Sequence, residues 1–446
     1  MSLITTRAEP AMQAARERYQ RILREHGDCP LTRGPVLVKH LLRGNRGMPG
    51  GITDTSFVHP YQGVQFNGDL PCNEAVEKAK VPEAIFWYML VERLPGADEL
   101  AALQNDLSQR LEVPGYAWDV LDALPTSVHP MTQLQTVTNA LEGEATFRDA
   151  YLDGANPEDY WTLMLEDGLN LIAWQHQVAA AIYRRIFGDG QRMTPNPIHD
   201  WSEQFVRMLG VGDPDGHLTA YMRVYFITHA DHEATNASAN TGAIVNSTLA
   251  TLATTLTAAY GALSGPRHGM ANQESLMFIE QIIKHFDGVP SEPEAARYID
   301  DFLAAGNVLS GFGHAQLRDI DSRFIVLTNY LATIPQVAER NDIIRCMQVI
   351  AKAAPEVLAK RPKIANPHQN IDFGSGAVLS ALGLKERTFY TVLFCISRMW
   401  GIIAQAVRAR AERRPIMRPI SLTTAMVEEA AKGGPEALDT YFLAEA

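Results

Sequence analysis

The chain has few of the features that mark several classes of protein. Its 446 residues include only four cysteines, which are scattered along the chain without a CxxC pair or a metal-binding spacing. This pattern argues against a disulfide framework and predicts free thiols in a reducing compartment. The net charge is −12. Because no basic excess is available to neutralise phosphates, no nucleic-acid partner is expected.

The first residues are not expected to act as a targeting signal. The segment Met1–Glu9 has no apolar stretch of the kind found in a signal peptide. Glu9 and Glu17 lie among the arginines of the N-terminal region, and mitochondrial presequences usually avoid acidic residues. The sequence therefore predicts a cytoplasmic protein.

One long apolar run, Phe389–Val407, resembles a membrane span in length. Arg398 lies in its middle, where a charge facing lipid would be costly. We therefore expect this run to form a buried helix of a large protein, and we expect the protein to have no membrane partner. The arginine then needs a partner of its own, because an unpaired buried charge is strongly unfavourable.

Helix signals dominate the rest of the chain. Apolar residues recur at helical spacing, and proline or glycine marks several helix ends, in 8–26, in a segment that opens at Asn156 and ends near Gly188, in 241–263 and in 385–413. Strand candidates are limited to Val36–Val38 and Gly63–Phe66. The sequence predicts an all-α fold with at most a small N-terminal sheet.

Three loops rich in glycine, proline and asparagine carry the unusual polar residues, at 264–272, 305–323 and 362–376. They contain His268, His314 and Asp372. Proton removal from a thioester methyl needs a base and a hydrogen-bond donor at the carbonyl oxygen, and attack on a ketone needs a second donor. Two histidines and one carboxylate meet these requirements, since a neutral imidazole can donate.

Arginines supply the complementary half of such a site. Arg323, Arg398 and Arg418 could each hold a carboxylate through the two prongs of a guanidinium. Taken alone, Arg418 would be a solvated residue of a basic turn. Arg398 is harder to explain without a ligand, because its surroundings are apolar, and a dianionic ligand would offset the cost of burying it.

These residues resemble the signature of the citrate synthase family, in order and over nearly the whole chain. Gly265–Gly269 matches the family's Gly-Pro-x-His-Gly, Gly311–His314 its Gly-Tyr/Phe-Gly-His, and Asn370–Asp372 its Asn-Val/Ile-Asp. Asp231–Ser238 resembles Asp-His-Glu-x-x-Asn-x-Ser. The likeness is to the longer form found in eukaryotes and some bacteria.

The resemblance assigns roles residue by residue. It implies that Asp372 is the base, that His268 stabilises the acetyl enol and that His314 activates the oxaloacetate carbonyl. It implies oxaloacetate contacts from His232, Arg323, Arg398 and Arg418, the last contributed across a homodimer to the neighbouring site. Coenzyme A contacts would come from Arg46, Arg318, Val308, Gly311 and Gly313, although surface solvation explains the two arginines equally well. No metal and no permanently bound cofactor is implied.

Three departures from the family pattern affect the acyl-CoA side. Arg267 stands directly before His268, where relatives usually carry a small or apolar residue. The chain lacks a coenzyme A arginine that some relatives carry near Pro157. Gly63–Gly68 stands where the family has an arginine-bearing Gly-x-Arg-Phe-Arg-Gly. Catalysis should survive these changes, whereas acyl specificity and coenzyme A affinity are open.

By the resemblance, we expect citrate formation from acetyl-CoA and oxaloacetate. Residues 1–270 and 381–446 would form a large domain and 271–380 a small mobile domain. A 2-methylcitrate synthase using propionyl-CoA, or another acyl-CoA relative, fits the same motifs, because one methylene is worth only about 1–3 kcal/mol. Two other classes of protein are alternatives. One is a metal hydrolase built on His229–Glu233, a segment that matches no zinc motif. The other is a catalytically inactive helical scaffold.

Overall fold

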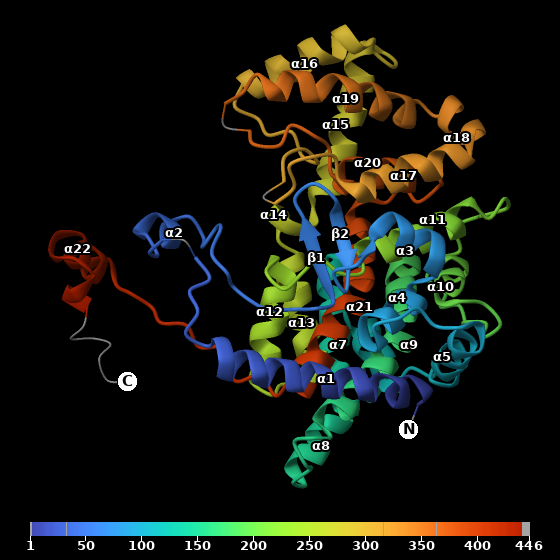
Figure 1. The fold of residues 1–446 in the computed structure, drawn as a ribbon. Coiled ribbons are helices and arrows are strands. Elements are labelled where there is room, and N and C mark those ends of the chain that lie inside the picture. The colour runs from blue at the N-terminus through green and yellow to red at the C-terminus, as the bar shows by residue number, and fades with distance from the viewer. Residues whose placement is uncertain (1, 33, 315, 363, 439–446) are drawn as a thin grey trace.

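The structure is a computed structural model that describes residues 2–32, 34–314, 316–362 and 364–438 (Figure 1). Within these ranges it is mostly helical, which confirms the predicted fold class. The α-helices are α1 Leu3–His26, α2 Val38–Leu42, α3 Cys72–Ala79, α4 Pro82–Val91, α5 Ala97–Gln109, α6 Gly115–Ala123, α7 Pro130–Ala140, α8 Thr146–Leu152, α9 Tyr160–Phe187, α10 Trp201–Leu209, α11 His217–His229, α12 Ala237–Ser247, α13 Leu252–Leu263, α14 Pro266–Gly269, α15 Ala271–Phe286, α16 Glu292–Ala304, α17 Ser322–Thr333, α18 Pro335–Arg340, α19 Asp342–Ala359, α20 Ile371–Ala381, α21 Tyr390–Ala411 and α22 Thr424–Gly433. Short 3-10 turns lie at Leu141–Glu144, Arg387–Phe389 and Pro435–Leu438.

The predicted small sheet has three antiparallel strands, β1 (Ser56–His59), β2 (Gly63–Phe66) and β3 (Leu70–Pro71). In the β1–β2 hairpin Ser56 pairs with Phe66 and His59 with Gly63. The second strand candidate, Val36–Val38, was wrong, because Val38 begins α2. The side chain of His40 accepts a hydrogen bond from Leu37 N at 3.1 Å, a local contact that closes a helical turn.

The core is built around α9 and α21, which pack against each other. The stretch 387–411 is the one helix in the described part of the chain that is long and apolar enough to cross a membrane. Of its most apolar window, 94% is buried inside the protein, as expected for the core helix of a large protein. Arg398 lies in this helix and is 1% exposed.

The single helix predicted over 241–263 is in fact two helices, α12 and α13, which pack closely side by side. The break falls at Leu249, whose φ of +63° is incompatible with a continuous right-handed helix. Thr251 then caps α13, its hydroxyl accepting from Thr254 N at 3.4 Å. The composition of 241–263 favours a helix throughout, but the left-handed backbone conformation of Leu249 ends one helix before the next begins.

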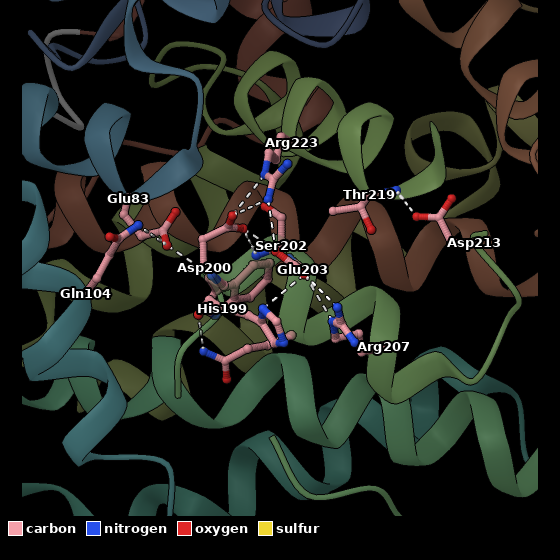
Figure 2. A network of polar contacts seen from close by, with 12 residues as sticks. Glu83, Gln104, His199, Asp200, Ser202, Glu203, Arg207, Asp213, Thr219 and Arg223 are labelled. Atoms are coloured by element: carbon pink, nitrogen blue, oxygen red, sulfur yellow. Dashed lines mark hydrogen bonds and ion pairs between the residues drawn. The ribbon is translucent and has the colours of Figure 1, made fainter. Parts of the chain in front are cut away.

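A network of charged side chains fixes α11 against α4 and α10 (Figure 2). Asp200 caps α10 through Ser202 N and Glu203 N, both at 3.0 Å, and accepts from Arg223 of α11 at 2.9 Å. Buried Glu83 of α4 accepts from Trp201 N at 3.0 Å. The network matters for function because α11 ends at His229, directly before the segment that carries His232.

Two groups of elements stand apart from the body in Figure 1. Helices α15 to α20 gather at one end, with α16 packed on α19. At one side, α2 and α22 project away from the body on extended segments. These two arms expose large apolar side chains, including Leu31, Val36, Leu42, Ile416 and Ile420.

Candidate active site

Two loops that are distant in sequence are joined by backbone pairing. Phe312 forms an antiparallel bridge with Gln369. Asn370 N donates to Gly311 O at 2.9 Å, and Gly313 N to His368 O at 3.4 Å. This short ladder places the segment that contains His314 beside the start of α20.

Asp372 lies in the first turn of α20. Its backbone N–H donates to the side chain of Asn370, the helix cap, at 3.0 Å. Burial raises the pKa of the Asp372 carboxyl to about 6, and the charge of Asp321 acts in the same direction, while Arg323 and Arg398 oppose it. A carboxylate whose pKa is raised toward 7, and whose charge two guanidinium groups still favour, suits a general base.

His314 presents a defined tautomer. Its Nδ1 accepts from the backbone N–H groups of Gln316 and Leu317, both at 3.2 Å. Burial and, to a smaller extent, the charge of Arg323 together lower the pKa of His314 to about 4. The ring is therefore neutral at pH 7 with its proton on Nε2, which leaves Nε2–H as a donor.

His232 lies beside His314, with ring centroids 5.4 Å apart. Burial, followed by the charges of Arg323 and Arg398, holds the pKa of His232 well below its usual value. Its Nδ1 is buried without a hydrogen-bond partner among the described residues. A buried polar atom without a partner is uncommon in proteins and fits a group that waits for a ligand.

His268 lies in α14, outside the predicted loop conformation but next to the same cluster. Its Nε2 is 3.0 Å from the hydroxyl of Ser238 at the start of α12. Its ring packs edge-on against Phe394, with centroids 5.8 Å apart. Burial lowers the pKa of His268 to about 4, with a further contribution from Arg398. This imidazole is also neutral at pH 7.

Ser238 has one hydroxyl proton and two neighbouring acceptors, the side-chain oxygen of Asn236 at 2.9 Å and His268 Nε2. When the hydroxyl donates to His268, the imidazole carries its proton on Nδ1 and can donate from there. Asn236 is itself held in place by donating to His232 O at 2.6 Å. Ser238 is therefore a positioning residue that orients the ring of His268.

Replacing Ser238 with alanine should lower kcat about 10- to 100-fold, as expected for the loss of a partner that orients a reacting histidine. The KM for the oxaloacetate that the sequence resemblance implies should change little, because the described residues that hydrogen-bond the Ser238 hydroxyl are His268 and Asn236. Steady-state kinetics of Ser238→Ala and Ser238→Thr test this. The threonine variant keeps the hydroxyl and should recover most of kcat; equal losses in both variants would contradict the assignment.

Arg323 and Asp321 form a buried ion pair at the start of α17. Arg323 Nη2 lies 2.7 Å from Asp321 Oδ2, and Nε lies 3.0 Å from Oδ1. Asp321 also accepts from Ile371 N at 3.2 Å, which links the pair to the turn of Asp372. Burial lowers the pKa of Arg323, but the Asp321 charge and hydrogen bonds outweigh it and raise the pKa overall. Arg323 stays charged.

Arg398 has a different environment. Its Nε donates to His229 O at 2.9 Å, and its guanidinium lies over the ring of Phe394, 4.9 Å from the centroid. No carboxylate lies within ion-pair distance of it among residues 2–32, 34–314, 316–362 and 364–438. Burial lowers the pKa of Arg398 to about 10, so the group still carries its charge at pH 7. A buried cation with no ion pair marks a binding position for an anion.

The other predicted site residues lie outside this cluster. Arg418 is exposed on the segment that leads to α22, and Arg46 is exposed near α2. Arg318 lies on the surface, where its backbone N–H donates to Pro60 O at 2.7 Å. The remaining three lie on one loop: Val308 is 81% exposed, Gly313 is exposed and Gly311 is buried.

The cluster thus brings together His232, His268, His314, Asp372, Arg323 and Arg398. Three supporting residues were not predicted, namely Ser238, Asp321 and Phe394. Two of them could have been found, since Ser238 closes the motif that contains His232 and Asp321 precedes Arg323 in the Asp-x-Arg motif. Phe394 lies four residues before Arg398 on α21 and had no signal beyond its helical spacing.

The metal-hydrolase alternative finds no support in the geometry of His229–Glu233. The ring of His229 stacks on Tyr225, and its Nδ1 bonds Tyr225 O at 2.9 Å. Asp231 accepts from Thr55 at 2.6 Å and from Gln405 at 2.7 Å. Within the described ranges, no group of three or more histidine, cysteine, aspartate or glutamate side chains is arranged to hold a metal ion.

Comparisons with known proteins identify relatives of this chain. The family described as "Citrate synthase, C-terminal domain" matches residues 44–420. The peroxisomal citrate synthase of Saccharomyces cerevisiae is 35% identical over 422 residues, covering 93% of this chain and 90% of that protein. The mitochondrial citrate synthase of Daucus carota is 35% identical over 424 residues, covering 93% and 88%.

Solved structures show the same fold. The citrate synthase of Pyrobaculum aerophilum superimposes with a TM-score of 0.74 at 23% identity, covering 88% of this chain and 95% of that chain. The enzyme of Thermoplasma acidophilum, in a ternary complex with carboxymethyl coenzyme A and oxaloacetate, gives a TM-score of 0.72 at 19% identity, covering 86% and 95%.

The fold and the site define an acyltransferase-class enzyme of a family that condenses an acyl-CoA with oxaloacetate. The chain belongs to the citrate synthase family.

Proposed function

We propose that this enzyme condenses acetyl-CoA with oxaloacetate and hydrolyses the resulting citryl-CoA to citrate and coenzyme A. The observation that carries the proposal is the cluster itself. A carboxyl with a raised pKa, Asp372, shares its surroundings with neutral imidazoles and with Arg398, a buried cation without a carboxylate partner. Enolisation beside a bound carboxylate ligand requires this combination.

The reaction follows from the placement of each group. Asp372 takes a proton from the acetyl methyl, and the C–H electron pair becomes the carbon–carbon double bond of the enol. His268 donates a hydrogen bond to the thioester oxygen, where negative charge develops. The enol carbon then attacks the ketone carbon of oxaloacetate while His314 Nε2–H hydrogen-bonds the ketone oxygen. The new hydroxyl gains one proton overall, which balances the proton that Asp372 took, so the base and both imidazoles return to their starting states. Water then cleaves the thioester, giving citrate and the free thiol.

Oxaloacetate would be held by Arg323, Arg398 and His232. Within one chain, Arg323 is already paired with Asp321, whereas Arg398 has no ion pair among the described residues. A dianionic substrate therefore meets one unpaired arginine and needs a further positive charge. Arg418 supplies it if the C-terminal arm of a second copy reaches this site. The exposed apolar side chains of the two arms support such a homodimer.

On the acyl-CoA side, we propose that the loop Val308–Gly313 contacts the adenine through its backbone and that Arg46 and Arg318 bind phosphates. The hydrogen bonds between this loop and the start of α20 would couple coenzyme A binding to the position of Asp372. We further propose that residues 271–380 move as a small domain that closes over the substrates, excluding water from the enol. Cytoplasmic location stays a prediction from sequence.

The pH dependence of kcat/KM should follow the ionisation of Asp372. Because burial raises the pKa of this base to about 6, the active carboxylate is lost as the pH falls through that value. The rate should fall about tenfold per pH unit below it and level off above pH 7, because His268 and His314 stay neutral throughout. Rates measured from pH 5 to 8.5, with circular dichroism as a folding control, test this; a profile flat down to pH 5 would contradict the assignment.

Initial rates of thiol release with oxaloacetate and either acetyl-CoA or propionyl-CoA test the proposal as a whole. We expect a higher kcat/KM with acetyl-CoA. Equal or better use of propionyl-CoA would instead identify a 2-methylcitrate synthase. Thiol release with neither substrate would refute both activities.

A further inference from the structure

We propose that Arg267 is an additional binding residue for the acyl-CoA substrate, and that its guanidinium binds a phosphate of the coenzyme A moiety. This inference rests on the proposed function and names a residue that the family pattern does not supply. It starts from the one charged substitution next to a reacting group, because Arg267 directly precedes His268.

Arg267 and His268 point to different sides of α14. His268 is fixed toward the cluster by Ser238 and Phe394. Neighbouring residues of a helical turn project about 100° apart, and Arg267 is exposed. Its guanidinium therefore points away from the cluster and toward solvent. That position suits the phosphorylated part of the substrate and does not suit a carboxylate on the acyl group.

Arg267 begins an exposed stripe that continues along α15. Met270 joins the two helices in a helical conformation, and Glu274 N donates to Met270 O at 3.0 Å. Positions 267, 274 and 277 share one side of this nearly continuous helix and are exposed. Met277 is 53% exposed. The stripe offers one cation near His268 and an apolar side chain farther along.

The proposed coenzyme A loop, Val308–Gly313, is hydrogen-bonded to this same stripe. Ser310 donates to Glu274 at 2.5 Å, and the next residue, Gly311, accepts from Asn370 at the start of α20. Val308, 81% exposed, lies two residues before this anchor. A coenzyme A moiety that lay along this loop and reached His268 would pass the stripe on which Arg267 lies.

The electrostatics favour a phosphate at Arg267. The chain carries a net charge of −12, so a polyanionic substrate needs local cations at its entrance. Among the described residues, no hydrogen bond, ion pair or ring contact engages the guanidinium of Arg267, which leaves its donors available for two-pronged phosphate binding. Glu274, on the same stripe, accepts from Ser310 and makes no ion pair with Arg267 in the part of the chain that the structure describes.

The test compares Arg267→Leu, which restores an apolar residue of the kind relatives carry, with Arg267→Lys and wild type. Each is assayed with acetyl-CoA and with acetyl-pantetheine, which has no phosphate beyond the thiol-bearing arm. The leucine variant should raise the KM for acetyl-CoA about tenfold, the factor that corresponds to about 1.4 kcal/mol. Its kcat should stay within about twofold, and the lysine variant should recover part of the affinity.

Acetyl-pantetheine separates the proposal from a structural effect. If Arg267 binds phosphate, the substitution should leave the kinetics with acetyl-pantetheine unchanged. An equal loss with both substrates, or an unchanged KM for acetyl-CoA, would overturn the proposal. Arg297→Leu, at an exposed arginine on α16 without an ion pair among the described residues, is the matched control and should behave as wild type with both substrates.

Direct binding keeps this inference separate from the proposed function. Calorimetric titration of free coenzyme A, with oxaloacetate present, should give a Kd about tenfold weaker for Arg267→Leu than for wild type. If wild type releases thiol normally and the variant binds coenzyme A as tightly as wild type, the Arg267 proposal is wrong and the proposed function stands. Absence of thiol release in wild type would sink the proposed function, whatever the variant binds.

Discussion

Replacing Asp372 with asparagine should lower kcat by about 10³-fold or more, within the range that general base catalysis contributes. That factor corresponds to about 4 kcal/mol of transition-state stabilisation. The amide has nearly the shape of the carboxylate but cannot take a proton from the acetyl methyl. The KM for oxaloacetate should change far less, because Arg323 and Arg398 remain in place.

Stopped assays with high enzyme concentration can measure the residual rate of Asp372→Asn. Thermal unfolding provides the folding control. We expect the variant to be at least as stable as wild type, because the amide removes a carboxylate whose raised pKa shows that burial disfavours its charge. Activity at the wild-type rate would show that another group is the base.

Gly311→Ala should disable the enzyme without touching any group that reacts. A Cβ at this position would lie 2.5 Å from Phe373 Cα and 2.7 Å from Phe373 N, and Gly311 has a φ of +81°, which L-residues rarely adopt. Phe373 directly follows Asp372, so relief of the collision must move the base. A displacement of about 1 Å can cost about 10²-fold in rate.

Gly313→Ala is the matched control for this substitution. Gly313 has a similar φ of +73°, but a Cβ there would meet only Asn366 O at 3.6 Å, an ordinary contact. Both variants should lose stability through the backbone conformation. A much larger loss of kcat in Gly311→Ala is the expected result, and equal losses in the two variants would mean that the collision with Phe373 is unimportant.

The sequence predicts which residues belong to the site better than it predicts how the backbone brings them together. The motifs around His268, His314 and Asp372 identified the family and the helical fold, which the comparisons confirm. Nothing in the sequence indicated that Phe312 pairs with Gln369. Such pairing depends on packing of the whole chain rather than on local preference.

Local conformation was also harder to predict than residue identity. His268 and Asp372 were expected in loops, yet the structure places them in first turns of helices, where capping by Asn370 and a proline at the start of α14 satisfy the backbone. The break between α12 and α13 rests on the positive φ of Leu249, a residue that normally favours helix. The protonation pattern of the histidines required buried neighbours that only the structure provides.

The most direct test of the central claim follows the methyl protons. Purified enzyme is incubated with oxaloacetate and an equal mixture of ordinary acetyl-CoA and acetyl-CoA whose methyl group carries three deuterons, and the first citrate formed is analysed by mass spectrometry. Because Asp372 breaks a methyl C–H bond to form the enol, we predict that this citrate comes mainly from the ordinary substrate, with a smaller share that carries two deuterons. Equal amounts of the two citrates would contradict enolisation as the step that limits the rate, and the absence of citrate would contradict the proposed reaction.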